Sequence, residues 1–490
     1  MNASFPLLTT LILWPMLAAA LLLLLPNRLA RSLALLAAMA QLVLAAWLLT
    51  DMGPNFRWVE RFEWIPSLKI QYLLGVDGLS MLFLPLAAWL FVAVIASGWN
   101  QVQTLPRVYY ALLLMLEGIT MGIFSALDTI LFFLFWEASL IPLFVLILLW
   151  GVGPRRRMAA IKYTLLMLAG GVALLLGFIM AALHQMEMGN PWLFDLPLLL
   201  ENPLPGPVQT WVFLLLLAGF AIKVPVIPLH TWLPLLALEG PIGVLAIMTG
   251  IKLGVYGLMR FAIPIAPQAA LEYQWLLSVL GGVGVLYGSL AALLQTNVRP
   301  MLAFASIGHV GLVLMGLASF TQQGWHGAIL QVLHFILASG GIFLMAGFLH
   351  HRFNSTDVAY LGGLAKNMPL AAALFLFLGL AGLGAPLTAG FPAELLIYTA
   401  TLRTSLGSVL VALTGQILAA TYFITIYRRI FTGPLLHAAS GQDLRQREIL
   451  VALWFVVPIL VLGIFPSLVL DLIAEPVRSW MAQGGFLLNK

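Results

Sequence analysis

Inside an apolar run stand the residues Gly219-Phe220-Ala221-Ile222-Lys223-Val224-Pro225-Val226-Ile227-Pro228-Leu229-His230-Thr231-Trp232-Leu233-Pro234, which place a lysine and three prolines where hydrocarbon is expected. The run begins near Trp211, so Lys223 lies about 18 Å along a helix, close to the middle of a bilayer. A charge at that depth costs roughly 2.5–3.5 kcal/mol or more. Pro225 also removes a backbone donor. The stretch therefore predicts a discontinuous helix whose lysine lies in a polar pocket inside a helix bundle.

The composition bounds the class of protein. The chain has 490 residues, of which 62% are hydrophobic and 8% charged, and its mean hydropathy is +1.04. These values predict an all-α polytopic membrane protein in contact with the lipid bilayer. Without cysteine the chain cannot form disulfides, thiolate metal sites or thiol nucleophiles. Its net charge of +5 is spread over loops, so no nucleic-acid partner is expected. We expect no cofactor and no metal site.

The hydropathy pattern predicts about fourteen spans in a single membrane domain, 1–490. The first apolar run lacks a cleavage site and is interpreted as a span. The spans are expected at about 5–25, 32–50, 79–99, 107–127, 129–151, 159–183, 211–234, 240–262, 274–294, 299–318, 326–349, 368–402, 406–427 and 449–472. A polar segment, 51–77, separates the second span from the third, and Asp77 is expected to cap the latter at the interface.

The basic residues predict the topology. With the N-terminus outside, fourteen Lys and Arg residues fall on the inside and seven on the outside, Arg260 among the latter. Because positive residues accumulate on the cytoplasmic side, both termini are predicted to lie outside. In a bacterial inner membrane this is the periplasmic side.

A second break is expected in the stretch 368–402, which is too long for one straight span. It contains Gly382-Leu383-Gly384-Ala385-Pro386-Leu387-Thr388-Ala389-Gly390-Phe391-Pro392-Ala393-Glu394. The two broken spans, the seventh and the twelfth, lie five spans apart. Such pairs are typical of inverted repeats around a central ion site.

Ionisable side chains are rare inside the apolar runs, so each is a candidate for function. Acids, amines and imidazoles with water between them can pass protons, and an acid–lysine pair adds a switch. The candidates are Glu137, Lys223, Lys252, His309, His334 and Glu394, with Glu117 and His230 as additional ones. Glu117 has a simpler interpretation as the partner of a neighbouring span, and a lone buried histidine is often only a core hydrogen-bonding residue.

Several motifs at these residues resemble the antiporter-like subunits of proton-pumping NADH:quinone oxidoreductase, respiratory complex I. They are Leu-Gly-Val-Asp-Gly-Leu-Ser at 74–80, Phe-Trp-Glu-Ala-Ser-Leu-Ile-Pro at 135–142, Ile-Lys-Val-Pro at 222–225 with His-Thr-Trp-Leu-Pro at 230–234, Lys-Leu-Gly-Val-Tyr-Gly-Leu-Met-Arg-Phe at 252–261, Ala303–Gly311 and Gly390–Glu394. The resemblance covers nearly the whole chain. It is strongest to subunit M, the counterpart of mitochondrial subunit 4. Only a short tail follows the last expected span, where subunit L carries a long lateral helix.

The resemblance implies two inverted five-helix repeats, at about 106–262 and 273–432, between N-terminal spans at 1–105 and a C-terminal span at 433–490. It implies that Glu137 and Lys223 form the coupling pair. Lys252, His309 and His334 would form the central relay, and Glu394 the far-side residue. The implied partners are neighbouring antiporter-like subunits and a peripheral arm that carries out the redox chemistry. The chain departs from the usual pattern at Leu235-Leu236-Ala237, at Asn297–Pro300 and at Pro392.

Three other functions stay open at this point. The central charges are shared with related cation/proton antiporters, membrane-bound hydrogenases and inorganic-carbon uptake complexes. A secondary transporter of an organic solute would need a substrate-sized cavity with specific polar groups. A non-pumping structural subunit is disfavoured because the ionisable row is intact.

Overall fold

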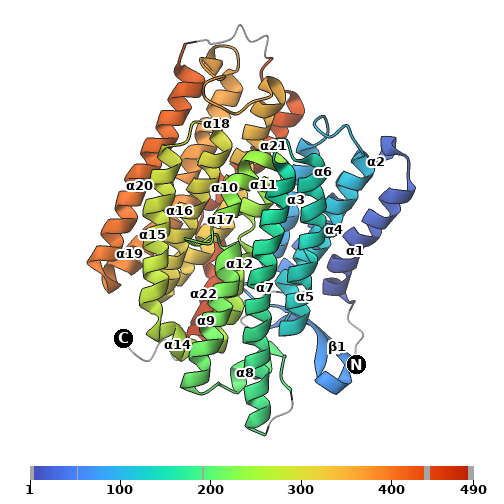
Figure 1. Ribbon diagram of the computed structural model, residues 1–490, viewed down its shortest axis with the longest axis vertical. Coiled ribbons are helices and arrows are strands. Elements are labelled where there is room, and N and C mark those ends of the chain that lie inside the picture. Colours follow the sequence, from blue (N-terminus) through green and yellow to red (C-terminus); the bar gives the residue numbers. More distant parts are fainter. Residues whose placement is uncertain (1–4, 52, 54, 190–191, 435–441, 484–490) are drawn as a thin grey trace.

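Helices running up and down one long axis form the molecule, and a short β-hairpin lies at its lower end (Figure 1). The computed structural model describes residues 5–51, 53, 55–189, 192–434 and 442–483. In the first half the elements are α1 (Leu7–Leu24), α2 (Asn27–Trp47), β1 (Arg57–Ile65), β2 (Ile70–Val76), α3 (Phe83–Ser97), α4 (Pro106–Ser125), α5 (Thr129–Ala138), α6 (Leu140–Trp150), α7 (Arg156–Glu187), α8 (Leu196–Glu201), α9 (Gly206–Lys223) and α10 (Trp232–Glu239). In the second half they are α11 (Ile242–Gly250), α12 (Leu253–Gly257), α13 (Ile263–Ile265), α14 (Pro267–Glu272), α15 (Gln274–Leu293), α16 (Val298–Ala318), α17 (Gln322–Phe353), α18 (Pro369–Gly382), α19 (Gly390–Thr404), α20 (Leu406–Tyr427), α21 (Gln446–Ile464) and α22 (Ser467–Gln483).

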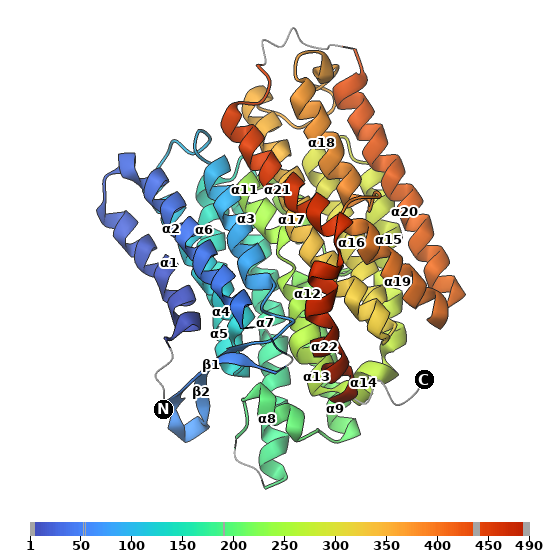
Figure 2. The ribbon, with the colours of Figure 1, turned by 180° about the vertical axis from the view of Figure 1, so that it is seen from behind.

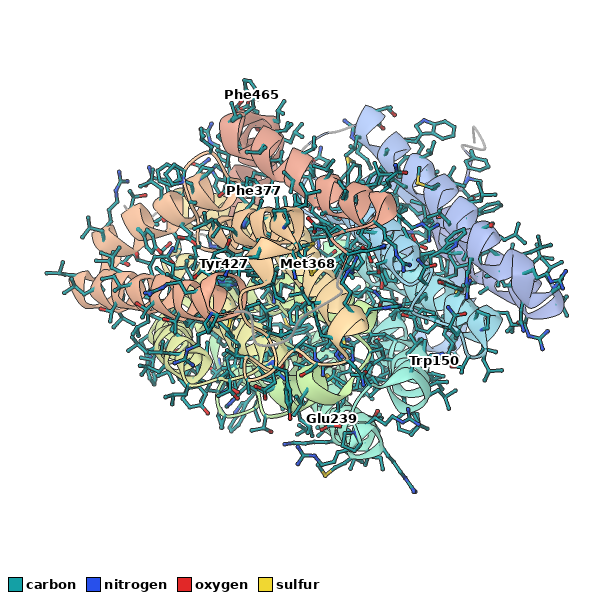
Figure 3. The ribbon with its side chains drawn as sticks, turned by 90° about the horizontal axis from the view of Figure 1, so that it is seen from above. Trp150, Glu239, Met368, Phe377, Tyr427 and Phe465 are labelled. Carbon is teal, nitrogen blue, oxygen red and sulfur yellow. The ribbon has the colours of Figure 1, made fainter. Side chains whose placement is uncertain are left out.

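The predicted class, an all-α polytopic membrane protein, is confirmed. Among the described residues, twelve helical segments are long and apolar enough to cross a membrane by length and composition. Two further apolar helices, α3 and α18, are shorter. The count of fourteen spans stays a prediction. Seen from above, Trp150 and Glu239 lie on one side of the bundle and Phe465 on the opposite side (Figure 3).

Two segments differ from the sequence prediction. The polar segment 51–77 contains an antiparallel hairpin, β1–β2, whose Glu60 carboxylate accepts hydrogen bonds from the first backbone amides of α1, Leu8 N and Thr9 N. The span predicted at 449–472 ends earlier, at Ile464. After Pro466 the chain continues as α22, which runs toward the lower end of the bundle (Figure 2). Val469, Ile473, Val477 and Met481 recur every fourth residue and are buried, so α22 packs one apolar face on the bundle.

The predicted breaks are present, and polar groups meet the carbonyls that they free. Between α9 and α10 the chain leaves the helix at Val224–Thr231, where Trp232 Nε1 donates to Ile222 O at 2.9 Å. Between α18 and α19 the break covers Leu383–Ala389, where His334 Nε2 lies 3.0 Å from Ala381 O. A third break, between α11 and α12, places Lys252 outside regular helix. Such partners make irregular backbone tolerable at membrane depth.

The order of spans repeats along the chain. The helices α7 and α17 each have 32 residues, and each is followed by a broken pair, α9/α10 or α18/α19. The next span then closes on a π-helical turn, Leu258–Ala262 or Arg428–Thr432. The broken pairs run in opposite directions along the long axis (Figure 1). This order agrees with inverted repeats, while the repeat boundaries at 106–262 and 273–432 stay predictions.

A buried ion pair ties the start of α3 to the eighth span. Asp77 accepts hydrogen bonds from Leu79 N and Ser80 N, as expected of a cap, and also pairs with Arg260 through two nitrogens. Arg260 is 3% exposed. The carboxylate of Asp77 compensates its charge inside the bundle, while the side of the membrane on which Arg260 lies stays a prediction.

Replacing Arg260 with alanine is expected to lower the free energy of unfolding by about 3–5 kcal/mol, since it leaves the Asp77 charge buried and unpaired. The thermal unfolding of the full chain in detergent measures the effect. The matched control is Arg57→Ala, which removes a pair with Asp51 whose side chains are 44% and 52% exposed and should cost less than about 1 kcal/mol. Equal losses in both variants would contradict a structural role for the buried pair.

Candidate functional site

Lys223 ends α9 and points at the junction of α5 and α6. Its Nζ donates to Ser139 Oγ at 3.2 Å and lies 3.9 Å from the centre of the Trp136 ring. Ser139 Oγ in turn donates to Trp136 O at 2.7 Å. The ammonium therefore has a hydroxyl and an aromatic face as its partners.

Lys252 has a similar environment one span further on. It is buried, its Nζ donates to Ser306 Oγ on α16, and the centre of the Phe335 ring is 5.7 Å away. Each lysine thus lies at the interruption of its own span and meets a serine hydroxyl from another helix.

One cavity connects the two lysines. It has a volume of about 40 Å³, and its walls include Lys223, Ser139, Lys252 and Ser306. A water molecule needs roughly 10–15 Å³ of such space and two to four polar partners. The cavity therefore has room for about two or three waters and offers both amines and both hydroxyls as partners.

Glu137 is the predicted partner of Lys223, and its role in a coupling pair stays a prediction. Among the described residues no ion pair joins Glu137 to Lys223, and its Oε1 is buried without a hydrogen-bond partner. A Cβ on Gly171 of α7 would come within 2.0 Å of that oxygen, so the glycine makes room for the carboxyl group. Leu134 and Ile141, on the same face of the α5–α6 segment, are 41% and 61% exposed. Glu137 is therefore half-buried at the lateral surface of the bundle, and the predicted coupling pair is open in this conformation.

The two histidines both lie beside the break between α18 and α19. His309 on α16 stacks on Phe335 with ring centres 4.7 Å apart and lines two small cavities, of about 30 and 20 Å³. His334 on α17 contacts Ala381 O through Nε2. The Nδ1 atoms of both rings are buried and have no hydrogen-bond partner among the described residues.

Glu394 lies in the first turns of α19, beyond the break. It is buried and accepts hydrogen bonds from Tyr398 at 3.2 Å and, at 3.5 Å, from Gln331. Gly384 has a positive φ of 64°, and a Cβ there would lie 2.5 Å from Glu394 Oε2. The turn therefore needs glycine for its backbone and for the space that the carboxyl group fills.

The two additional candidates, Glu117 and His230, lie apart from the row of predicted proton-transfer residues. The members of that row are Glu137, Lys223, Lys252, His309, His334 and Glu394. Glu117 on α4 is fully buried, and in the part of the chain that the structure describes neither of its carboxyl oxygens has a hydrogen-bond partner. It therefore does not pair with a neighbouring span in this conformation. His230 lies in the break after Lys223, packed edge-on to Tyr287 with ring centres 5.1 Å apart. Neither residue lines the cavity between the lysines.

Sequence reasoning missed the neutral members of the site. Ser139 follows Glu137 by two residues, Ser306 precedes His309 by three and Tyr398 follows Glu394 by four, so spacing on a helix places the last two beside known candidates. Gly171 and Gly384 could not have been found in this way. Their role depends on a carboxyl group that arrives from another helix or from across a break.

Comparison with known proteins gives the family. The family profile described as "NADH:quinone oxidoreductase/Mrp antiporter, TM" matches residues 126–419. NADH-quinone oxidoreductase subunit M of Rhodobacter capsulatus is 37% identical over 89% of this chain and 87% of its own length. NADH-ubiquinone oxidoreductase chain 4 of Arabidopsis thaliana is 34% identical over 98% of both chains.

Solved structures agree in fold. A chain of respiratory complex I from Thermus thermophilus, 31% identical, superposes with a TM-score of 0.89 over 98% of this chain and 100% of that one. A chain of the Mrp complex from a Dietzia species, 23% identical, has a TM-score of 0.86 over 98% and 99% and shows the shared fold. The chain therefore belongs to the family of membrane-spanning antiporter-like subunits of NADH:quinone oxidoreductases and Mrp antiporters, with relatives of the subunit M (chain 4) type.

Proposed function

We propose that this chain is the M-type subunit of an NADH:quinone oxidoreductase and moves protons across the membrane without a redox centre of its own. The redox reaction of NADH with quinone would take place in a peripheral arm. The single observation that carries the proposal is the cavity that places Lys223, Ser139, Lys252 and Ser306 around space for about two or three waters. It favours proton transfer over transport of an organic solute, because a cavity of about 40 Å³ is far below the roughly 300 Å³ of a ligand site.

The proposed path starts at the lateral surface and crosses the bundle. Glu137 would receive the signal from a neighbouring membrane subunit that covers the exposed face around it. When Lys223 leaves Ser139 for Glu137, the ion pair holds the proton on the amine. When the pair opens, as here, the proton can pass through the cavity to Lys252 by way of the serine hydroxyls and water.

Beyond Lys252 the path would continue through Ser306 and His309, three residues apart on α16. His309 lines the cavities that reach toward the break, where His334 and Glu394 lie. The free Nδ1 atoms of the histidines can accept a proton, and Glu394 with Tyr398 would release it on the far side.

We propose a bacterial inner membrane with both termini on the periplasmic side. The basic residues support this orientation, and α1 begins and α22 ends at the same end of the bundle (Figure 1).

Glu137→Gln is expected to lower the share of NADH-driven proton translocation that passes through this chain by roughly 10²-fold, because the neutral amide cannot hold the lysine's proton. Proton uptake into inverted membrane vesicles, measured per NADH oxidised, tests it. The control is Glu201→Gln, which removes an exposed carboxylate on α8 and should leave the ratio unchanged. Full translocation in the Glu137 variant would refute the assignment.

Partner identity separates the proposal from its relatives. The proteins that copurify with the tagged chain in mild detergent should include a peripheral arm that oxidises NADH. A hydrogenase module, or a set of membrane subunits without any redox arm, would instead assign the chain to a hydrogenase or to a cation/proton antiporter.

A further inference from the structure

Helix α21 begins at the upper end of the bundle (Figure 1). A cavity that lies apart from the predicted proton-transfer residues adjoins its first turn. Its volume is about 530 Å³, more than ten times that of the cavity between the lysines. Its walls come from the end of α3, the loop behind it, the end of α17 and the start of α21. The proton path described above makes no use of it.

Three arginines line this cavity, and only one of them is neutralised. Arg352 donates to both carboxylate oxygens of Glu448 and to the carbonyl oxygens of Phe348, Gln442 and Asp443. Arg445 and Arg447 are exposed, and in the described part of the chain no carboxylate forms an ion pair with either guanidinium. The cavity therefore carries an excess of two positive charges that no carboxylate of the described residues neutralises.

An aromatic floor fixes one of the two free cations. The guanidinium of Arg447 lies over Trp99, 4.6 Å from the ring centre, which orders the side chain without consuming its N–H donors. Tyr360 also lines the cavity. Tryptophan and tyrosine are the residues that favour the headgroup level of a bilayer.

The depth of the cavity also fits the headgroup level. Two apolar helices end beside it, α3 at Ser97 and α17 at Phe353, and a third, α21, begins there at Gln446. From this rim an exposed apolar stripe continues along α21. Its members are Leu450, Leu453, Val457 and Val461, which are 66%, 40%, 55% and 42% exposed. A molecule with an anionic head and long apolar chains would match the cavity and the stripe together.

We infer that this cavity binds the headgroup of an anionic phospholipid, with Arg445 and Arg447 on the phosphate and the acyl chains along α21. Guanidinium groups suit the recognition of phosphate because their donors match two oxygens at once. The inference depends on the membrane location of the chain and not on its role in proton transfer.

A photoreactive phosphatidylglycerol tests the inference on the purified assembly that contains the full chain. Mass spectrometry of the labelled peptides should find the label at 96–101 and 445–451. Arg445→Gln with Arg447→Gln should reduce the labelling affinity roughly thirtyfold, since each basic residue near an anionic headgroup contributes about 1 kcal/mol. The matched control, Arg28→Gln with Arg107→Gln, removes two exposed charges outside the cavity. The photoreactive lipid should label this variant with the same affinity as the unaltered chain.

Competition on the unaltered chain gives a second test that needs no variant. Excess unlabelled phosphatidylglycerol should remove the label, whereas phosphatidylcholine and inorganic phosphate should not. Equal competition by phosphatidylcholine, or displacement by inorganic phosphate alone, would overturn the lipid assignment. So would equal loss of label in the control variant, or a cavity that crosslinks to a neighbouring subunit in place of the lipid.

Discussion

Lys223→Ala is expected to reduce proton translocation through this chain by roughly 10²- to 10⁴-fold, the range typical for loss of a positioned proton-transfer group. The methyl group of alanine leaves the cavity between Ser139 and Lys252 without its first amine. It also leaves Glu137 without the cation that the proposed switch requires. Proton uptake per NADH oxidised, in inverted vesicles, measures the loss.

The control for this variant is Lys366→Ala. Lys366 is exposed in a short 3₁₀ turn before α18, so its loss changes the net charge equally without touching the row. It should translocate as the unaltered chain does. If Lys223→Ala assembles normally and translocates as many protons per NADH oxidised as the unaltered chain, the path cannot run through this amine.

Gly384→Ala should have the second-largest effect, because two costs coincide at one residue. A left-handed backbone costs a residue with a Cβ roughly 1–2 kcal/mol. The new methyl group would also lie 2.5 Å from Glu394 Oε2, so the carboxyl group must leave its place beside Tyr398 and Gln331. We expect the variant to assemble and to translocate clearly fewer protons per NADH oxidised, measured in the same inverted vesicles.

The break itself supplies the matched control. Gly382 ends α18 two residues earlier, has no positive φ, and a Cβ there would meet only His309 Cε1 at 3.9 Å, an ordinary contact. Gly382→Ala should therefore keep most of its activity. Similar losses in both variants would mean that the break as a whole, and not the position of Glu394, limits translocation.

The parts of the fold that follow from hydrocarbon depth could be predicted from the sequence. A lysine beside Pro225 and a run of Gly and Pro before Glu394 each cost too much inside lipid to be an ordinary helix, and both breaks are present. The helix over 406–427 matches its prediction at both ends. The hairpin of β1 and β2 was not predicted, because its charged residues serve contacts such as Glu60 with the start of α1.

The parts of the site that depend on distant contacts could not be predicted in this way. The pairing of Lys223 with Ser139, and not with Glu137, depends on how the α5–α6 junction packs against α9. The burial of Arg260 depends on Asp77, 183 residues away. Nothing in the local sequence of Arg260 reveals a partner at that distance.

Ordered water between Lys223 and Lys252 tests the central claim most directly. An experimental density map of the assembled complex, at a resolution that shows water, should contain about two or three water molecules in the cavity that Ser139 and Ser306 help to line. They should lie within hydrogen-bond distance of the two amines. A cavity that is dry, or closed by apolar side chains in every observed state, would contradict proton transfer from one lysine to the other.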